Sequence, residues 1–81
     1  MEMINQDTIK EIVDYYGGVI LYNITIQNIL SIKIDVNNLI FWIRLSDQGI
    51  EVDINQAKGL SVTDLVIITS IVSDVHNRNM E

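Results

Sequence analysis

The fold is decided by the stretch LSIKIDVNNLIFWIRL, residues 30–45. Apolar side chains occupy every second position on both sides of Asn37-Asn38, which is the spacing of β-strands with one buried face. Asparagine tolerates the positive φ angles that a two-residue hairpin turn requires. We therefore expect a hairpin that pairs Ile34 with Phe41 on its buried face.

Two further strands are predicted to flank this hairpin. The strand at residues 39–46 should lead through a turn at Ser46 to Gly49 into a strand at residues 50–55. Alternation also begins at Val19, and a three-residue turn at 27–29 would set Ile26 opposite Leu30 and Ile24 opposite Ile32. In this register the apolar residues of all four strands share one face.

Helices are predicted at both ends. Residues 7–17 carry apolar side chains at helical spacing, Thr8 to Glu11 has the form of a capping box, and Gly17-Gly18 should stop the helix. Ser61 to Asp64 resembles a capping box before a second helix, at about residues 62–77. We therefore predict one α+β domain over residues 1–81, ordered α-β-β-β-β-α: a four-stranded antiparallel β-meander with both helices packed on one face.

The composition excludes several classes of function. The chain has 81 residues and no cysteine, so disulfides and thiolate metal sites are excluded. Five Lys and Arg against a net charge of −6 disfavour direct nucleic-acid binding. The first six residues lack the features of a signal peptide, and the longest apolar run is only Leu39 to Ile43. We expect a cytoplasmic protein that does not enter membranes.

The face opposite the core is predicted to be a mixed surface centred on Trp42. Helices on one side of an antiparallel sheet leave the other side facing water, and Trp and Arg are enriched in binding hot spots. The alternative is that the stems of Lys33 and Arg44 cover the indole and that nothing binds. The candidate partner-binding residues are Trp42, Arg44, Lys33, Glu51, Asp53 and Ile40.

The helices offer two further candidate surfaces. Asp7, Glu11 and Asp14 form an acidic stripe, which is either an ordinary solvated face or an attraction for a basic partner. The second helix is apolar over more than half of its circumference. It needs cover from the first helix or from a second subunit, and Ile67 and Ile71 are the candidate contacts of a homodimer.

The sequence does not indicate catalysis. Glu51 and Asp53 point the same way, but Lys33 and Arg44 would neutralise them across the strands. His76 stands alone near the end of the second helix. We expect no enzymatic activity, no metal and no cofactor.

These features favour a small acidic binding protein that blocks a site on a larger host or cognate protein. The architecture resembles that of small acidic phage and mobile-element proteins, including anti-CRISPR and other anti-defence inhibitors, and that of toxin-immunity proteins; the resemblance transfers no residue. One alternative is a homo-oligomeric structural or accessory subunit with no inhibitory target. A second is a nucleic-acid mimic that occupies a basic channel.

Overall fold

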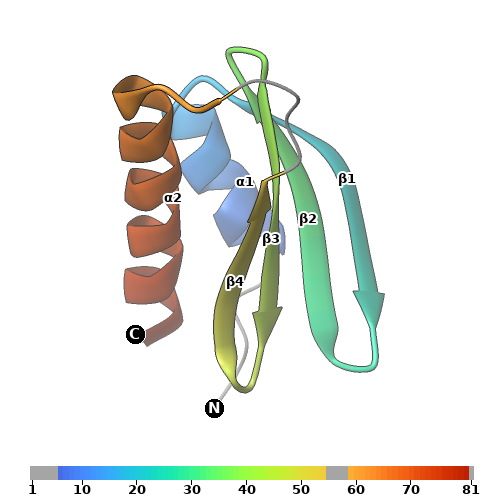
Figure 1. Cartoon of the computed structure of the whole chain (residues 1–81). Helices are drawn as coiled ribbons and strands as arrows, with labels where there is room; N and C mark the ends of the chain where they lie inside the picture. Colours follow the sequence, from blue (N-terminus) through green and yellow to red (C-terminus); the bar gives the residue numbers. More distant parts are fainter. Residues whose placement is uncertain (1–5, 55–58, 81) are drawn as a thin grey trace.

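The chain folds into the predicted order of elements (Figure 1). The computed structural model describes residues 6–54 and 59–80. Four antiparallel strands form one sheet in the order β1-β2-β3-β4, and the two helices lie on one face of it. The predicted α+β class is confirmed. The elements are α1 (Gln6–Tyr15), β1 (Val19–Ile26), β2 (Ile29–Val36), β3 (Leu39–Ser46), β4 (Gly49–Ile54) and α2 (Val62–Met80).

The register of β2, β3 and β4 confirms the sequence prediction. Ile34 lies opposite Phe41, and Phe41 lies opposite Ile54. The turn between β2 and β3 consists of Asn37 and Asn38, whose φ angles are 52° and 69°. Positive φ at both central residues is the mark of a type I′ turn, whose twist matches that of the strands. The predicted last residue of β4, at position 55, lies outside the described residues.

The register between β1 and β2 was predicted wrongly. The turn has two residues, Gln27 and Asn28, with φ of 52° and 65°, so Ile26 lies opposite Ile29 and not opposite Leu30. A shift of one residue turns each side chain of a strand to the other face. Ile24 therefore lies opposite Ser31, on the face away from the helices.

A bulge near the start of β1 restores the predicted faces for the residues that precede it, next to α1. The register changes between Ile20 and Tyr22. An extra residue in one strand reverses the alternation of faces beyond it. Ile20 therefore returns to the core layer opposite Ile34, whereas Tyr22 lies opposite Lys33 on the other face.

The ends of the helices follow from local hydrogen bonding. Helix α1 begins at Gln6, so the Thr8 motif does not mark its start, and it ends at Tyr15, before the predicted residue 17. Ser61 and Asp64 form the predicted capping box of α2: each backbone N–H donates to the other side chain, both at 3.1 Å. Within the described residues, neither helix has both the length and the apolar character needed to cross a membrane.

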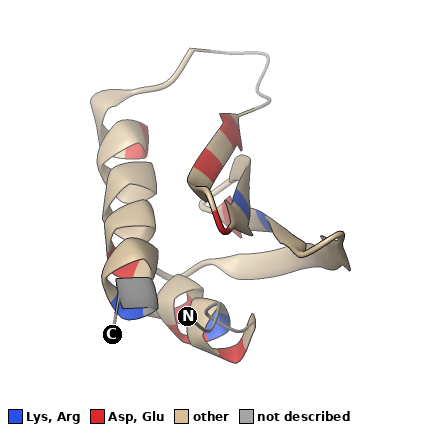
Figure 2. Ribbon diagram, turned by 90° about the horizontal axis from the view of Figure 1, so that it is seen from below, with Lys and Arg blue, Asp and Glu red and all other residues tan. Residues whose placement is uncertain are grey.

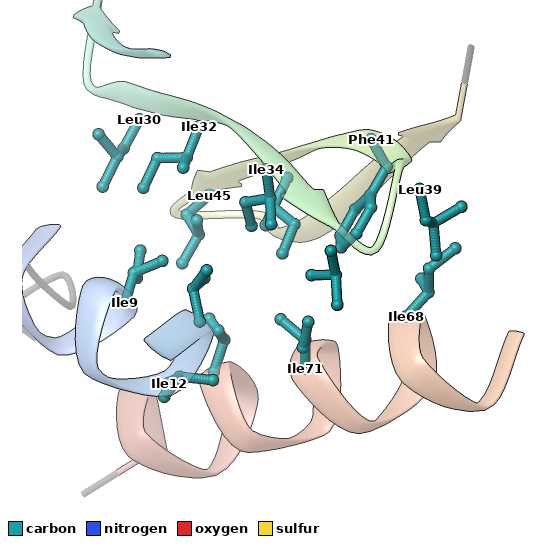
Figure 3. Packing of buried hydrophobic residues seen from close by; sticks show 14 residues of the cluster. Ile9, Ile12, Leu30, Ile32, Ile34, Leu39, Phe41, Leu45, Ile68 and Ile71 are labelled. Atoms are coloured by element: carbon teal, nitrogen blue, oxygen red, sulfur yellow. The ribbon is translucent and has the colours of Figure 1, made fainter. Parts of the chain in front are cut away.

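The core lies between the helices and one face of the sheet (Figure 3). Ile71 points from α2 into this layer and is 0% exposed. The prediction that Ile71 contacts a second subunit is therefore wrong, because its surface is already covered within the chain. The buried residues are Ile9, Ile12, Val13, Leu30, Ile32, Ile34, Val36, Leu39, Phe41, Ile43, Leu45, Ile68, Ile71 and Val75.

Candidate functional site

The main candidate site is the sheet face that the helices leave uncovered, which we call the open face. Its central row runs across all four strands through Tyr22, Lys33, Trp42 and Asp53. Among the described residues, both helices lie on the other side (Figure 2). The row beside it contains Ile24, Ser31, Arg44 and Glu51, and Ile26 with Ile29 close the β1–β2 end.

Trp42 is held in place by three neighbours on this face. The Tyr22 ring meets the indole edge to face, with centroids 6.0 Å apart. Lys33 Nζ and Arg44 Cζ each lie 6.0 Å from the centre of the Trp42 ring. These are the separations of weak cation–π contacts. The indole is half-buried by side chains of its own sheet.

The charged residues of the open face are arranged diagonally across the strands. Arg44 Nη2 lies 3.1 Å from Asp53 Oδ2, although Arg44 is directly opposite Glu51. No hydrogen bond or ion pair within the described residues engages the Glu51 carboxylate, which is exposed. Both charge signs are therefore present on this face, in a chain whose net charge is −6.

The apolar residues that β1 and the start of β2 add to the open face were not predicted from the sequence. Ile26 is 58% exposed, Ile29 is 40% exposed, and Tyr22 is 53% exposed. They join the face because the two-residue turn reverses this end of β1. The signal was the Gln27-Asn28 pair, which parallels Asn37-Asn38, but glutamine rarely adopts positive φ. Ile40, a predicted member, lies half-buried opposite Asp35, one row from Trp42.

Two residues of the acidic stripe on α1 form exposed ion pairs with cations of the same chain. Asp14 accepts a 3.1 Å hydrogen bond from Lys10 Nζ. Glu11 lies 3.9 Å from Arg78 Nη1 of α2. Of the predicted stripe, Asp7 alone has no ion pair within the described residues.

The outer side of α2 forms a second candidate surface. A groove of about 480 Å³ is lined by Val62, Leu65, Val66 and polar residues of the same helix face, with Tyr16 and Asp74 at its α1 end. Ile67 is half-buried against the core and does not line this groove. His76 is exposed.

Tyr16 and Asp74 join the two helices. The Tyr16 hydroxyl donates a 2.6 Å hydrogen bond to Asp74 Oδ2. This bond to the carboxylate, with desolvation and the negative charge of Asp74 adding to it, raises the pKa of Tyr16 above its ordinary value. Within the described parts of the chain, no group of three or more His, Asp or Glu side chains is placed to hold a metal ion.

Comparisons with protein-family models, curated proteins and solved structures found no significant match.

Proposed function

We propose that this protein is a non-enzymatic binding protein that covers a site on a larger protein with its open face. The observation that carries this proposal is the half-buried Trp42, set among Tyr22, Lys33 and Arg44 on a face that no described element packs against. Trp, Tyr and Arg are the residues that most often dominate binding energy at protein interfaces.

The ordering of the Trp42 cluster supports this proposal energetically. Association costs roughly 0.5–1.5 kcal/mol for each flexible side chain that becomes immobilised. Trp42 already has an aromatic neighbour at 6.0 Å and two cations at the same distance, and these contacts reduce the freedom that it loses on binding. A rigid sheet also presents these side chains more uniformly than a loop would.

The chemistry of the open face defines the partner surface that fits it. Ile24, Ile26 and Ile29, at the β1–β2 end of the face, call for an apolar area on the partner. Lys33, beside the indole, calls for a carboxylate, and Glu51, which has no ion pair within the described residues, calls for a cation. Such a match combines the burial of apolar surface with charge complementarity, which gives specificity.

Blocking is the mode of action that this geometry supports best. A sheet face that combines aromatic, apolar and charged side chains acts by occupying the surface it covers. Small phage-type inhibitors and immunity proteins act in this way, and we propose the same class of role here. The nucleic-acid mimic is less well supported, because Glu11 and Asp14 are already paired with cations.

The proposal is tested by capture with matched variants. Immobilised wild-type protein should retain a specific protein from a lysate of the organism that encodes it. Trp42→Ala and Tyr22→Ala should each weaken the complex by at least about 2 kcal/mol, roughly thirtyfold in Kd. Tyr15→Ala is the control, since Tyr15 is an exposed aromatic residue on α1, outside the open face.

Retention of the captured protein by wild type and Tyr15→Ala, with loss by the open-face variants, is the expected pattern. Equal capture by all four proteins would rule out the open face as the binding surface.

A further inference from the structure

The free edge of β1 is unusual for an outer strand. Its sequence, VILYNITI, contains no charged residue and no proline. Edge strands of soluble proteins are normally protected by charges, by proline, by bulges or by a covering element. β1 has a bulge near Ile20, which protects its first part only, and Tyr22 to Ile26 remains regular. The opposite edge strand, β4, carries Glu51 and Asp53.

The hairpin geometry shows which backbone groups are free. In an antiparallel pair, residues alternate between those bonded to the neighbouring strand and those turned away from it. The residues that flank a two-residue turn are bonded to each other, so Ile26, Ile24 and Tyr22 direct their backbone groups to β2. Asn23 and Thr25 then direct theirs to the open edge.

We propose that a second copy of this chain pairs with β1 through this edge, antiparallel and about a two-fold axis at Ile24. Asn23 of one copy then lies opposite Thr25 of the other, and each such pair exchanges two backbone hydrogen bonds. Ile24 meets Ile24 of the second copy. Tyr22 meets Ile26 of the second copy, on the open face.

The match of side chains in this register favours a second copy as the occupant. On the open face all pairs are apolar: one isoleucine pair and two tyrosine–isoleucine pairs, which are favourable cross-strand combinations. On the other face Asn23 and Thr25 pair polar with polar, and both are exposed in the single chain. A two-fold interface sets the residue on its axis against the same residue of the second copy. A charged residue there would meet a like charge, so an uncharged residue such as Ile24 is favourable.

The side chains of β4, the other edge strand, do not favour pairing with a second copy. Self-pairing of β4 would bring together two strands that each carry Glu51 and Asp53 within six residues, in a chain of net charge −6. Like charges at neighbouring positions destabilise strand pairing. The edge of β1, which carries no charge, is therefore the edge that favours pairing with a second copy.

Sedimentation of the purified protein with charge variants at the axis tests this inference. Wild type should pass from monomer, at 9.2 kDa, to dimer as its concentration rises. Ile24→Lys and Ile24→Glu should each raise the dissociation constant at least tenfold, because each sets like charges against each other. An equimolar mixture of the two variants should restore dimers, since Lys then faces Glu.

The controls separate this interface from other causes. Val66→Lys places the same charge in the groove on α2, where Val66 is 57% exposed, and should leave the dimer intact. Circular dichroism confirms that each variant is folded. If an Ile24 variant does not fold, Thr25→Pro removes a backbone N–H that faces the edge and should also yield monomers.

Three results would overturn the inference: a wild-type monomer at every concentration, Ile24 variants that dimerise as wild type does, or dissociation by Val66→Lys alone. The measurement uses the protein without any partner, so its outcome is independent of the capture experiment with Trp42→Ala.

Discussion

At the scale of single residues, Phe41 and Trp42 are neighbours in sequence with opposite environments. Phe41 is 0% exposed and packs in the core between the sheet and the helices. Trp42 lies on the open face. Phe41→Ala should cost about 3–5 kcal/mol of unfolding free energy, because it leaves a large cavity. Trp42→Ala should cost about 1 kcal/mol, since it removes a half-exposed ring and weak cation–π contacts.

Urea unfolding of both variants measures this difference. A severe loss for Trp42→Ala with a mild one for Phe41→Ala would mean that the strand register is shifted by one residue. Severe losses for both would mean that a second chain covers the open face, and the unfolding midpoint would then depend on protein concentration.

Tyr16 provides a residue-scale prediction about pH. Its hydrogen bond to Asp74 raises its pKa above the ordinary value of 10.0, so the folded chain holds this proton more tightly than the unfolded chain does. The resulting stabilisation is fully present below about pH 10 and is lost as the pH rises through the pKa of the folded state. The unfolding free energy of wild type should therefore fall more steeply above pH 10 than that of Tyr16→Phe.

Absorbance titration checks the same point directly. Wild type and Tyr15→Phe should show a tyrosine that ionises above the ordinary value, and Tyr16→Phe should lack it. Persistence of this component in Tyr16→Phe would contradict the assignment. Tyr15 is the suitable control because its ring stacks edge to face on Tyr16, 5.1 Å away between centroids, without sharing the bond to Asp74.

At the scale of elements, two adjacent glycines between α1 and β1 are required for different reasons, one for its backbone conformation and one for close packing. Gly17 N donates to Asp14 O at 3.0 Å and Gly18 N donates to Val13 O at 2.9 Å, which closes the helix. Gly17 has a φ of +75° but open space around it. A Cβ on Gly18 would lie 2.6 Å from Val36 Cγ2 and 2.9 Å from Val13 Cγ1, both in the core.

Alanine substitutions should distinguish the backbone requirement at Gly17 from the packing requirement at Gly18. Gly18→Ala should cost about 2–3 kcal/mol, because two branched core side chains must move. Gly17→Ala should cost about 1 kcal/mol, for the strain of its backbone alone. Gly59→Ala is the control and should change stability by less than about 0.5 kcal/mol, because nothing lies within 4 Å of its added Cβ. Urea unfolding of the three variants measures the order, and a mild effect at Gly18 would contradict the close packing.

The same scale shows where prediction from the sequence succeeded. Asn37-Asn38 admits one obvious hairpin, and its apolar alternation has one register that buries each core residue of β2 and β3. The Trp42 row follows from that register without further information. For β1 two registers were compatible with the apolar pattern, since VILYNITI places large apolar residues at both even and odd positions.

The choice between those registers depends on tertiary cover, which the local sequence does not encode. A longer turn would turn Ile24 and Ile26 to the helix side, but Asn23 and Thr25, which β1 places on that side, are both exposed. This part of β1 therefore gains little from facing the core side. The bulge near Ile20 keeps Ile20 on the core side, and the two-residue turn places Tyr22, Ile24 and Ile26 on the open face.

At the scale of the whole molecule, the strands differ in charge. Acidic residues lie on α1, α2, β2, β4 and the β3–β4 turn, and Lys33 and Arg44 lie on the sheet (Figure 2). β1 carries no charge. With a net charge of −6, two copies repel each other most where their helices and β4 strands approach. The least repulsive approach is through β1, beside the open face.

Extension of the sheet at β1 leaves the open face uncovered, so the proposed dimer and the proposed binding are compatible. Trp42 lies on β3, and five strand spacings, roughly 24 Å, separate the two β3 strands of the dimer. Each spacing adds roughly 20° of twist, so the two Trp42 clusters face directions about 100° apart. That divergence prevents one flat partner surface from covering both clusters. The dimer therefore offers two separate sites, and a partner that is itself multivalent would gain avidity from it without any new contact.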